Sequence, residues 1–155
     1  MKDKYYTPTI EELHVGFEYE FKPRLRQGLM SHVHQEFEYV NWWKKETIGR
    51  EREGIIDILE SYSNPFSLSD VLSYHKDKAI RVKYLDREDI ESLGFVKWPD
   101  DEIYDLGEFQ LHTNNYTNPL MIAIYDDNSQ YCFVGTIKNK SELKRILKQI
   151  GYEQQ

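Results

Sequence analysis

Hydrophobic and polar residues alternate with the two-residue period of a half-buried strand in two separate stretches of the chain. In residues 14–22 one face of the expected strand is apolar and consists of Val15, Phe17, Tyr19 and Phe21. In residues 79–84 the apolar face consists of Ile80, Val82 and Tyr84. The alternation therefore predicts two strands, each with one buried face.

Two helices are predicted from capping residues combined with helical spacing of apolar residues. Asp86 and Asp89 resemble a capping box at the start of a short helix, and Gly94 is placed to end it. Asn139 and Glu142 form the same kind of start for a C-terminal helix. The single apolar stripe of that helix consists of Leu143, Ile146, Leu147 and Ile150. A helix with one such stripe is expected to pack on one face of a sheet.

Four further strands are predicted in the second half of the chain, where short apolar runs lie between turn-forming residues. They span residues 95–98, 108–112, 120–125 and 131–138. The run LMIAIY at 120–125 is apolar on both faces, which favours a central strand.

The N-terminal half contains a predicted turn and a predicted strand pair. Thr7 is expected to cap a helical turn over residues 9–13, because Pro8 suits the first helical position. A strand at 33–43 is expected to pair with the strand at 14–22, since Phe-Glu-Tyr occurs in both.

Residues 44–78 have the weakest pattern of the chain. Apolar residues at 55–59 suggest a short helix. Ser67 or Ser69 could cap a second helix with inward positions at Leu68, Val71, Leu72 and His75.

The order of these elements predicts an α+β fold: an antiparallel sheet with helices packed on one side and an amphipathic helix at the C-terminus. The 155 residues fit a single domain, 1–155. Within it, residues 7–78 form an irregular half with a strand pair, and residues 79–152 form the strand–helix unit, a strand meander and the final helix.

Charge and cysteine content narrow the class of protein. The net charge of −7 argues against a broad basic face for nucleic acid. Cys132 is the only cysteine, so no internal disulfide can form, which suits a reducing compartment. No apolar run approaches the roughly 20 residues of a membrane span, and the first residues lack the apolar core of a secretion signal. We therefore expect an acidic cytoplasmic protein that binds neither membrane nor nucleic acid.

The chain contains few candidates for catalysis. His32, His34 and Glu36 would share a strand face and could bind a divalent metal ion, but two histidines without a third fixed ligand are also typical of an exposed polar stretch. A carboxylate patch of Glu18, Glu20, Glu36 and Glu38 could hold Mg²⁺, although the solvent face of a sheet has the same pattern.

No motif for a nucleophile, a phosphate or a dinucleotide is present, so no catalytic residue and no cofactor is assigned. Cys132 lies in an apolar strand and is expected to be a small buried hydrophobe.

The expected contact surface is the first strand pair and its loop, where aromatic and basic residues occur together. Its residues are Arg24, Arg26, Tyr39, Trp42 and Trp43. Tryptophan, tyrosine and arginine are the residues most often found at the energetic centre of interfaces. A different possibility is a pocket for a small anionic ligand, lined by Arg81, Lys83 and tyrosines.

Three stretches of the chain resemble a group of short proteins from gut anaerobic bacteria and their tailed phages. They are YYTPTIEELHVGFEYEF near the N-terminus, IRVKYLDREDIESLGF in the middle and GTIKNKSELKRILKQIG near the end. The group has no established activity, so the resemblance implies a small phage or prophage protein and no mechanism. We expect a non-enzymatic accessory protein that binds a host or phage macromolecule, with a protein as the expected partner. The alternatives are a small metal-dependent hydrolase or nuclease, and a protein that sequesters an anion.

Overall fold

The computed structural model describes residues 4–14, 16–25, 39, 41–48, 62–63, 68–113 and 118–153, and the structural statements below concern these residues. The chain divides into two compact units. The N-terminal unit is Tyr5–Val82, and the C-terminal unit is Lys83–Gln155 together with Met1–Lys4. Their boundary lies close to the division that the sequence suggests between residues 78 and 79. That the whole chain is one domain stays a prediction.

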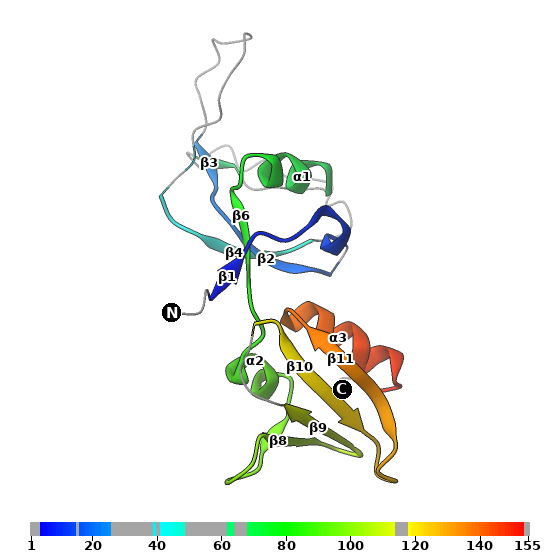
Figure 1. Ribbon diagram of the computed structural model, residues 1–155. Coiled ribbons are helices and arrows are strands. Elements are labelled where there is room, and N and C mark those ends of the chain that lie inside the picture. Colours follow the sequence, from blue (N-terminus) through cyan, green and yellow to red (C-terminus); the bar gives the residue numbers. More distant parts are fainter. Residues whose placement is uncertain are drawn as a thin grey trace, which may run out of the picture. The chain divides into compact units, whose positions relative to one another are not determined.

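The N-terminal unit contains a four-stranded sheet in the order β1-β6-β2-β4 (Figure 1). These strands are β1 (Tyr5–Tyr6), β6 (Ile80–Lys83), β2 (Glu18–Phe21) and β4 (Lys44–Thr47). The other elements are a turn of 3₁₀ helix η1 (Ile10–Glu12), the short pair β3 (Arg24–Leu25) and β5 (Tyr62–Ser63), and helix α1 (Leu68–Lys76). Helix α1 covers one face of the sheet, and its Val71 and Tyr74 join the same buried cluster as Phe17, Tyr19, Phe21, Ile80 and Val82.

Two predictions for this unit are wrong in detail. Strand β2 pairs with β4 on one edge and with Ile80–Arg81 of β6 on the other, so its partners among the described residues are not those predicted. Of the predicted strand at 33–43, only residues 39 and 41–43 are described. The repeated Phe-Glu-Tyr is a composition that suits strands, but it does not determine which strands pair. Phe21 is buried against the apolar face of β6. The first helical turn is capped by Thr9 instead of Thr7, because the Glu12 carboxylate accepts a hydrogen bond from the Thr9 N–H at 2.8 Å.

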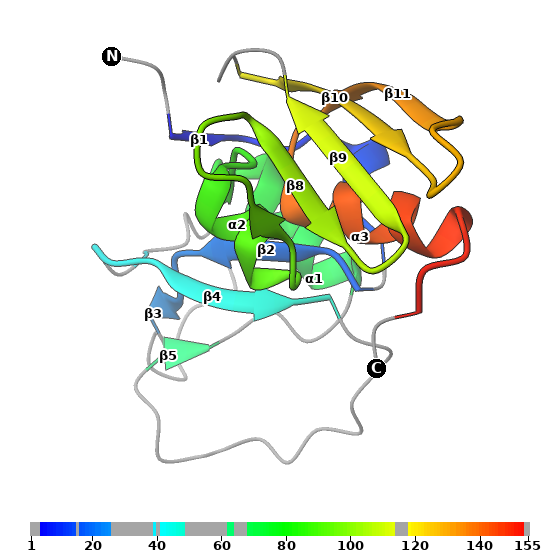
Figure 2. The same ribbon diagram turned by 90° about the horizontal axis from the view of Figure 1, so that it is seen from below.

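The C-terminal unit contains a five-stranded antiparallel sheet in the order β11-β10-β9-β8-β7 (Figures 1 and 2). Its strands are β7 (Val96–Lys97), β8 (Ile103–Leu106), β9 (Phe109–Thr113), β10 (Leu120–Tyr125) and β11 (Tyr131–Ile137). Helices α2 (Arg87–Ser92) and α3 (Lys140–Gln149) pack on one side of it, where Ile90, Leu143 and Leu147 join the buried residues of the sheet. The α+β fold with its C-terminal amphipathic helix is confirmed.

The helix ends in this unit are those that the sequence predicts. The Asp86 carboxylate accepts a hydrogen bond from the Asp89 N–H at 3.1 Å, and the Asn139 side chain accepts one from the Glu142 N–H at 2.9 Å. Gly94 follows α2 with a φ of +96°, a left-handed conformation that glycine adopts without strain. These caps explain why both helices could be located from short sequence patterns.

Three predictions for the C-terminal unit need correction. Strand β8 was not expected, although Tyr104 and Leu106 alternate with Ile103 and Asp105. Strand β10 is hydrogen-bonded on both edges, as expected of a central strand, but only one of its faces is buried, because Met121 is 45% exposed. Cys132 is half-buried instead of buried.

Candidate functional site

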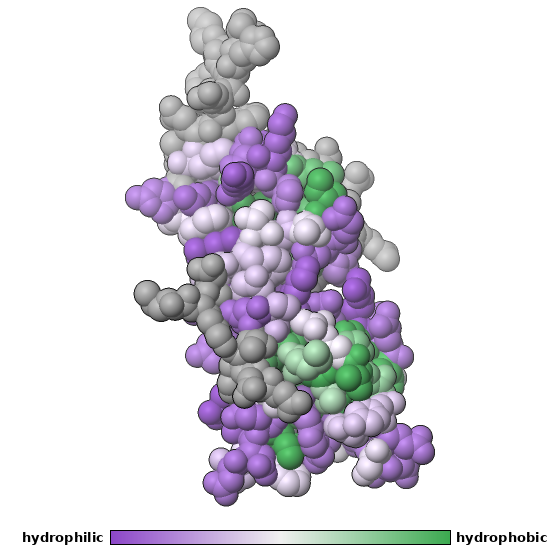
Figure 3. All heavy atoms as spheres, in the orientation of Figure 1, coloured by the Kyte–Doolittle hydropathy of each residue, from purple (hydrophilic) through white to green (hydrophobic). Residues whose placement is uncertain are grey.

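The face of the five-stranded sheet opposite α2 and α3 exposes several large apolar side chains. We call it the outer face. It is formed by the alternate strand positions Val96, Ile103, Asp105, Gln110, His112, Met121, Ala123, Tyr125, Val134 and Thr136, together with Trp98 and Tyr131. Val96 and Tyr131 are each 67% exposed and Val134 is 61% exposed. Figure 3 shows apolar residues gathered over β10 and β11 on the side turned to the viewer.

Strand alternation explains why these apolar side chains are exposed. In β10 the residues Leu120, Ile122 and Ile124 face the helices and are buried, so Met121 and Tyr125 must face the other way. A soluble protein usually places polar residues at such positions. A contiguous exposed apolar patch is typical of an interaction site.

The polar groups of the outer face are hydrogen-bonded to one another across three strands. Asp105 accepts hydrogen bonds from Trp98 Nε1 at 2.6 Å and from Gln110 Nε2 at 3.0 Å. His112 Nε2 lies 2.8 Å from the Gln110 amide oxygen, which can only accept, so Nε2 carries the proton in this contact. These bonds fix the Trp98 indole and the His112 ring on the sheet.

Aromatic stacking continues the row toward the edge strand β11. The ring centroids of His112 and Tyr125 are 4.7 Å apart, and those of Tyr125 and Tyr131 are 4.5 Å apart. Hydrogen bonding to Tyr131, helped by slight desolvation, raises the pKa of Tyr125. Rigid aromatic rings with few rotatable bonds lose little entropy when a partner covers them.

The side chains of the outer face suit contact with a partner better than they suit proton transfer. The Gln110 amide separates the Asp105 carboxylate from the His112 imidazole, so the carboxylate does not orient the imidazole directly as in a catalytic triad. Cys132 offers a poor nucleophile, because partial burial and then the carboxylates of Asp126 and Glu108 raise the pKa of its thiol. The outer face therefore offers a partner a defined shape and apolar surface area.

Two of the predicted contact residues, Arg24 and Tyr39, lie together in a cluster beside α1. The Arg24 guanidinium donates to the Tyr39 hydroxyl at 3.2 Å and to Ser73 Oγ at 2.6 Å, and it stacks on the Tyr74 ring at 4.1 Å. Tyr39 donates in turn to the Asp77 carboxylate. Burial, and next this hydrogen bond, raise the pKa of Tyr39 to about 12. The cluster ties three segments of the N-terminal unit together.

The two tryptophans of the predicted surface precede β4 and have different surroundings. Trp42 is 44% exposed, and Trp43 is half-buried beneath the Arg81 guanidinium, which lies 4.2 Å from its ring centroid. Trp42 lies in a bend and Trp43 directly precedes β4, so neither belongs to a strand, and neither lies in the core. Arg26, the remaining residue of this predicted surface, lies outside the described residues.

The cations expected to line an anion pocket both have carboxylate partners. Arg81 bonds Glu20 at 2.6 Å and stacks on the Tyr5 ring at 3.8 Å. Lys83 lies 2.6 Å from Asp86 and 3.2 Å from Asp89. Burial acts to lower the pKa of Lys83, but these two carboxylates outweigh it and the net pKa is raised.

The residues of the predicted metal site, His32, His34 and Glu36, lie outside the described residues, as does Glu38 of the acidic patch. That site stays a prediction. In the part of the chain that the structure describes, no group of three histidine, cysteine or acidic residues is placed to hold a metal ion.

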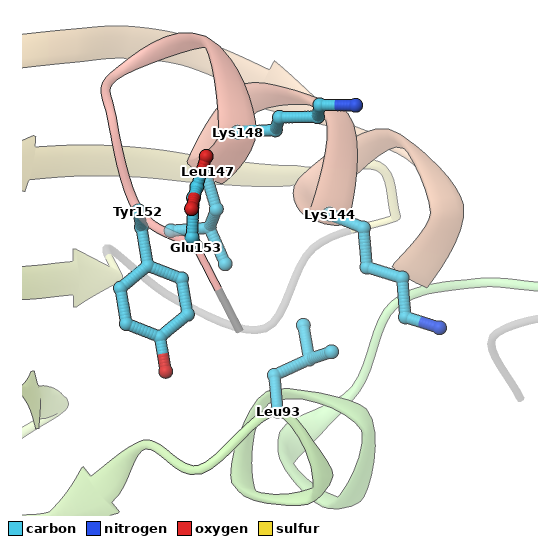
Figure 4. Close-up of a pocket in the computed structure, with 6 residues that line it drawn as sticks. All are labelled: Leu93, Lys144, Leu147, Lys148, Tyr152 and Glu153. Atoms are coloured by element: carbon cyan, nitrogen blue, oxygen red, sulfur yellow. The ribbon is translucent and has the colours of Figure 1, made fainter. Parts of the chain in front are cut away.

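A cavity of about 420 Å³ lies in the C-terminal unit between the end of α2 and helix α3 (Figure 4). It is lined by Leu93, Lys144, Leu147, Lys148, Tyr152 and Glu153. In Figure 4 the side chains of Leu93 and Leu147 point toward each other across the space, and the Tyr152 ring borders one side. The Lys148 amino group points away from it. The cavity thus has an apolar interior with charged groups at its rim.

The outer face was not identified from sequence because β8 was missed. Its signal was the two-residue turn Gly107-Glu108 between β8 and β9, with Leu106 paired to Phe109 and a positive φ of +59° at Gly107. A glycine with a positive φ at the first position of a two-residue turn is typical of a tight β-hairpin.

Comparison with family models, curated proteins and solved structures found no significant match to this chain. The helices of the described residues are all too short or too polar to cross a membrane. The site must therefore be interpreted from its own geometry.

Proposed function

We propose that this protein works by binding a partner protein through the outer face of the five-stranded sheet, without catalysing a reaction. The observation that carries the proposal is the exposure of Met121, Tyr131 and Val134 on a face whose Asp105, Gln110 and His112 side chains are already hydrogen-bonded. Covering such a face removes apolar area from water, at about 25 cal/mol per Å², and leaves few polar groups without partners.

The kind of partner follows from the chemistry of the face. Aromatic residues, methionine and few charges are typical of the centre of protein–protein interfaces. The resemblance of three stretches to short proteins of gut anaerobes and their phages supports a phage or prophage setting. We therefore propose a host or phage protein with an apolar, shape-complementary surface as the partner.

The proposal is tested by quantitative affinity capture from a host lysate, followed by calorimetry with each purified captured protein. Met121→Glu places a charge among the exposed apolar side chains of β10 and β11 on the outer face, where a bound partner would bury it without a counter-charge. We expect it to weaken binding at least tenfold. Binding to the unaltered protein should also show a negative heat-capacity change, the signature of apolar burial.

Gln149→Glu is the matched control, because it adds the same single charge at an exposed position on α3, away from the outer face. It should bind as the unaltered protein does. Equal capture by the unaltered protein and the Met121→Glu variant, or loss of capture in both variants, would contradict the proposal.

The cavity beside α3 favours a second candidate function, the sequestering of a small molecule with an apolar body and an anionic group. Its volume of about 420 Å³ is within the usual range for small-molecule sites. Lys144 lines the cavity and is the cation that would pair with the anion. Benzoate, which has this chemistry, should raise the melting temperature of the unaltered protein and not of Lys144→Gln. An unchanged melting temperature at high benzoate would exclude aryl carboxylates as ligands.

A further inference from the structure

Strand β11 is an exposed edge of the five-stranded sheet. It pairs with β10 along one side, and no described strand pairs with its other side (Figures 1 and 2). Only just past its end does the backbone have another partner, where the Lys138 carbonyl accepts a hydrogen bond from the Leu85 N–H at 2.8 Å. The peptide groups that point outward from an edge strand are a template for a further strand. The seven residues Tyr131–Ile137 contain no charged residue and no proline.

The opposite edge of the same sheet is protected. Strand β7 has only two residues, one of which is Lys97, and Pro99 follows it. Short length, lysine and proline are the means by which natural sheets prevent unwanted pairing. On β11 only a bulge near its start, where Tyr131 and Cys132 lie against Tyr125, interrupts the ladder. This difference between the two edges favours the pairing of β11 with a further strand.

We propose that β11 pairs antiparallel with β11 of a second copy of this chain, about an axis near Val134, to make one continuous sheet from two C-terminal units. The residues that flank β11 support a second copy as the occupant. Asp127 lies before the strand and Lys140 after it, at nearly equal sequence distances from Val134.

An antiparallel pair of identical strands brings Asp127 of one copy to the same end as Lys140 of the other, at both ends of the interface. A parallel pair would place like charges together. The neutral strand between them lets two chains of net charge −7 meet without close repulsion. The pairing is isologous, as closed dimers require.

The dimer goes beyond the proposed function, since it uses the edge of the sheet and not its outer face. The dimer would place two outer faces side by side on one continuous sheet. A partner protein with two copies of its binding site could then bind both outer faces at once, with a higher overall affinity. The two proposals can fail separately. Met121→Glu alters the second strand of the sheet and should leave dimerisation unchanged.

Sedimentation equilibrium across micromolar to millimolar concentrations tests the pairing. The unaltered protein should show a concentration-dependent dimer. Val134→Lys places two like charges at the axis and should abolish the dimer, because opposed like charges destabilise a strand pair. Asp127→Lys and Lys140→Glu should each weaken it by roughly two- to tenfold, within the range for exposed ion pairs.

The decisive variant is the double exchange Asp127→Lys/Lys140→Glu. It restores opposite charges only if the partner is the same chain, so it should recover most of the affinity lost by either single change. In a Cys132→Ser background, Val134→Cys should form a disulfide between copies, since paired strands bring opposed Cα atoms to within about 5.5 Å. A monomer at every concentration, or a dimer that Val134→Lys leaves intact, would overturn the proposal.

Discussion

The glycine that ends α2 allows a stability prediction with an internal control. Gly94 and Gly151 have nearly the same backbone, with φ values of +96° and +95°, and each follows a helix. An L-residue in the left-handed region costs about 1–2 kcal/mol. Alanine recovers about 0.4–1 kcal/mol of that by reducing the freedom of the unfolded chain. Gly151→Ala, whose added Cβ would meet nothing within 4 Å, should therefore cost about 1 kcal/mol.

Gly94→Ala carries the same backbone cost and a steric one. Its Cβ would lie 3.3 Å from Leu106 Cδ1, and Leu106 is buried in the core of the C-terminal unit. Crowding of a packed core costs about 1–3 kcal/mol, and a contact this mild belongs at the lower end. The expected loss is thus about 2 kcal/mol, roughly twice that of Gly151→Ala.

Urea unfolding followed by the NMR signal of the buried Leu111 amide measures both variants in the unit where they lie. Equal losses would show that Leu106 moves aside at no cost. No loss in either variant would refute the left-handed conformations themselves. The result also bears on the site, because Gly94 directs the chain from α2 into β7 and so positions Trp98 on the outer face.

Two further predictions concern the contacts that hold each unit together. Asp86→Ala removes the cap of α2 and an ion-pair partner of Lys83, and it should lower the free energy of unfolding of the C-terminal unit by about 1 kcal/mol in urea titrations. Tyr39 keeps its proton to about pH 12 in the fold but only to about pH 10 in an unfolded chain, so its contribution to stability is complete below pH 10 and is lost as the pH rises toward 12. Tyr39→Phe should remove that part of the pH dependence, and an unchanged alkaline unfolding curve would contradict the raised pKa of Tyr39, which comes first from burial and then from the hydrogen bond to Asp77.

The elements predicted correctly are those fixed by local chemistry. The helix from Lys140 to Gln149 needs only its Asn139 cap and an apolar stripe, and both are local in sequence. Strands β6 and β10 were located by the same kind of evidence. The partner of β2 was not, because strand pairing depends on which distant apolar face completes the core. Phe21 lies opposite Ile80, far along the chain, and no local pattern encodes that choice.

The candidate site was harder to predict than the fold for a related reason. The outer face combines residues from all five strands, and its position depends on the register of each strand. Met121 belongs to a run that looks suitable for complete burial, and only the placement of α3 on one side of the sheet decides that it is exposed. Aromatic and basic residues that are close in sequence are a weaker guide to a binding site, because they can pack against one another within the fold.

The two sheets differ in the side chains that they could offer a partner. On the N-terminal sheet the Arg81 guanidinium is paired with Glu20 and stacked on the rings of Tyr5 and Trp43. A partner that covered this group would have to desolvate an ion pair that is already formed, and such a cost can exceed the gain. On the outer face of the C-terminal sheet, Met121 and Val134 are exposed apolar side chains, so covering them removes apolar area from water without breaking an ion pair. We therefore expect binding at the apolar run of β10, whereas Arg81 and Trp43 contact each other within the N-terminal unit. Binding through the surface predicted from Arg24, Arg26, Tyr39, Trp42 and Trp43 stays a prediction.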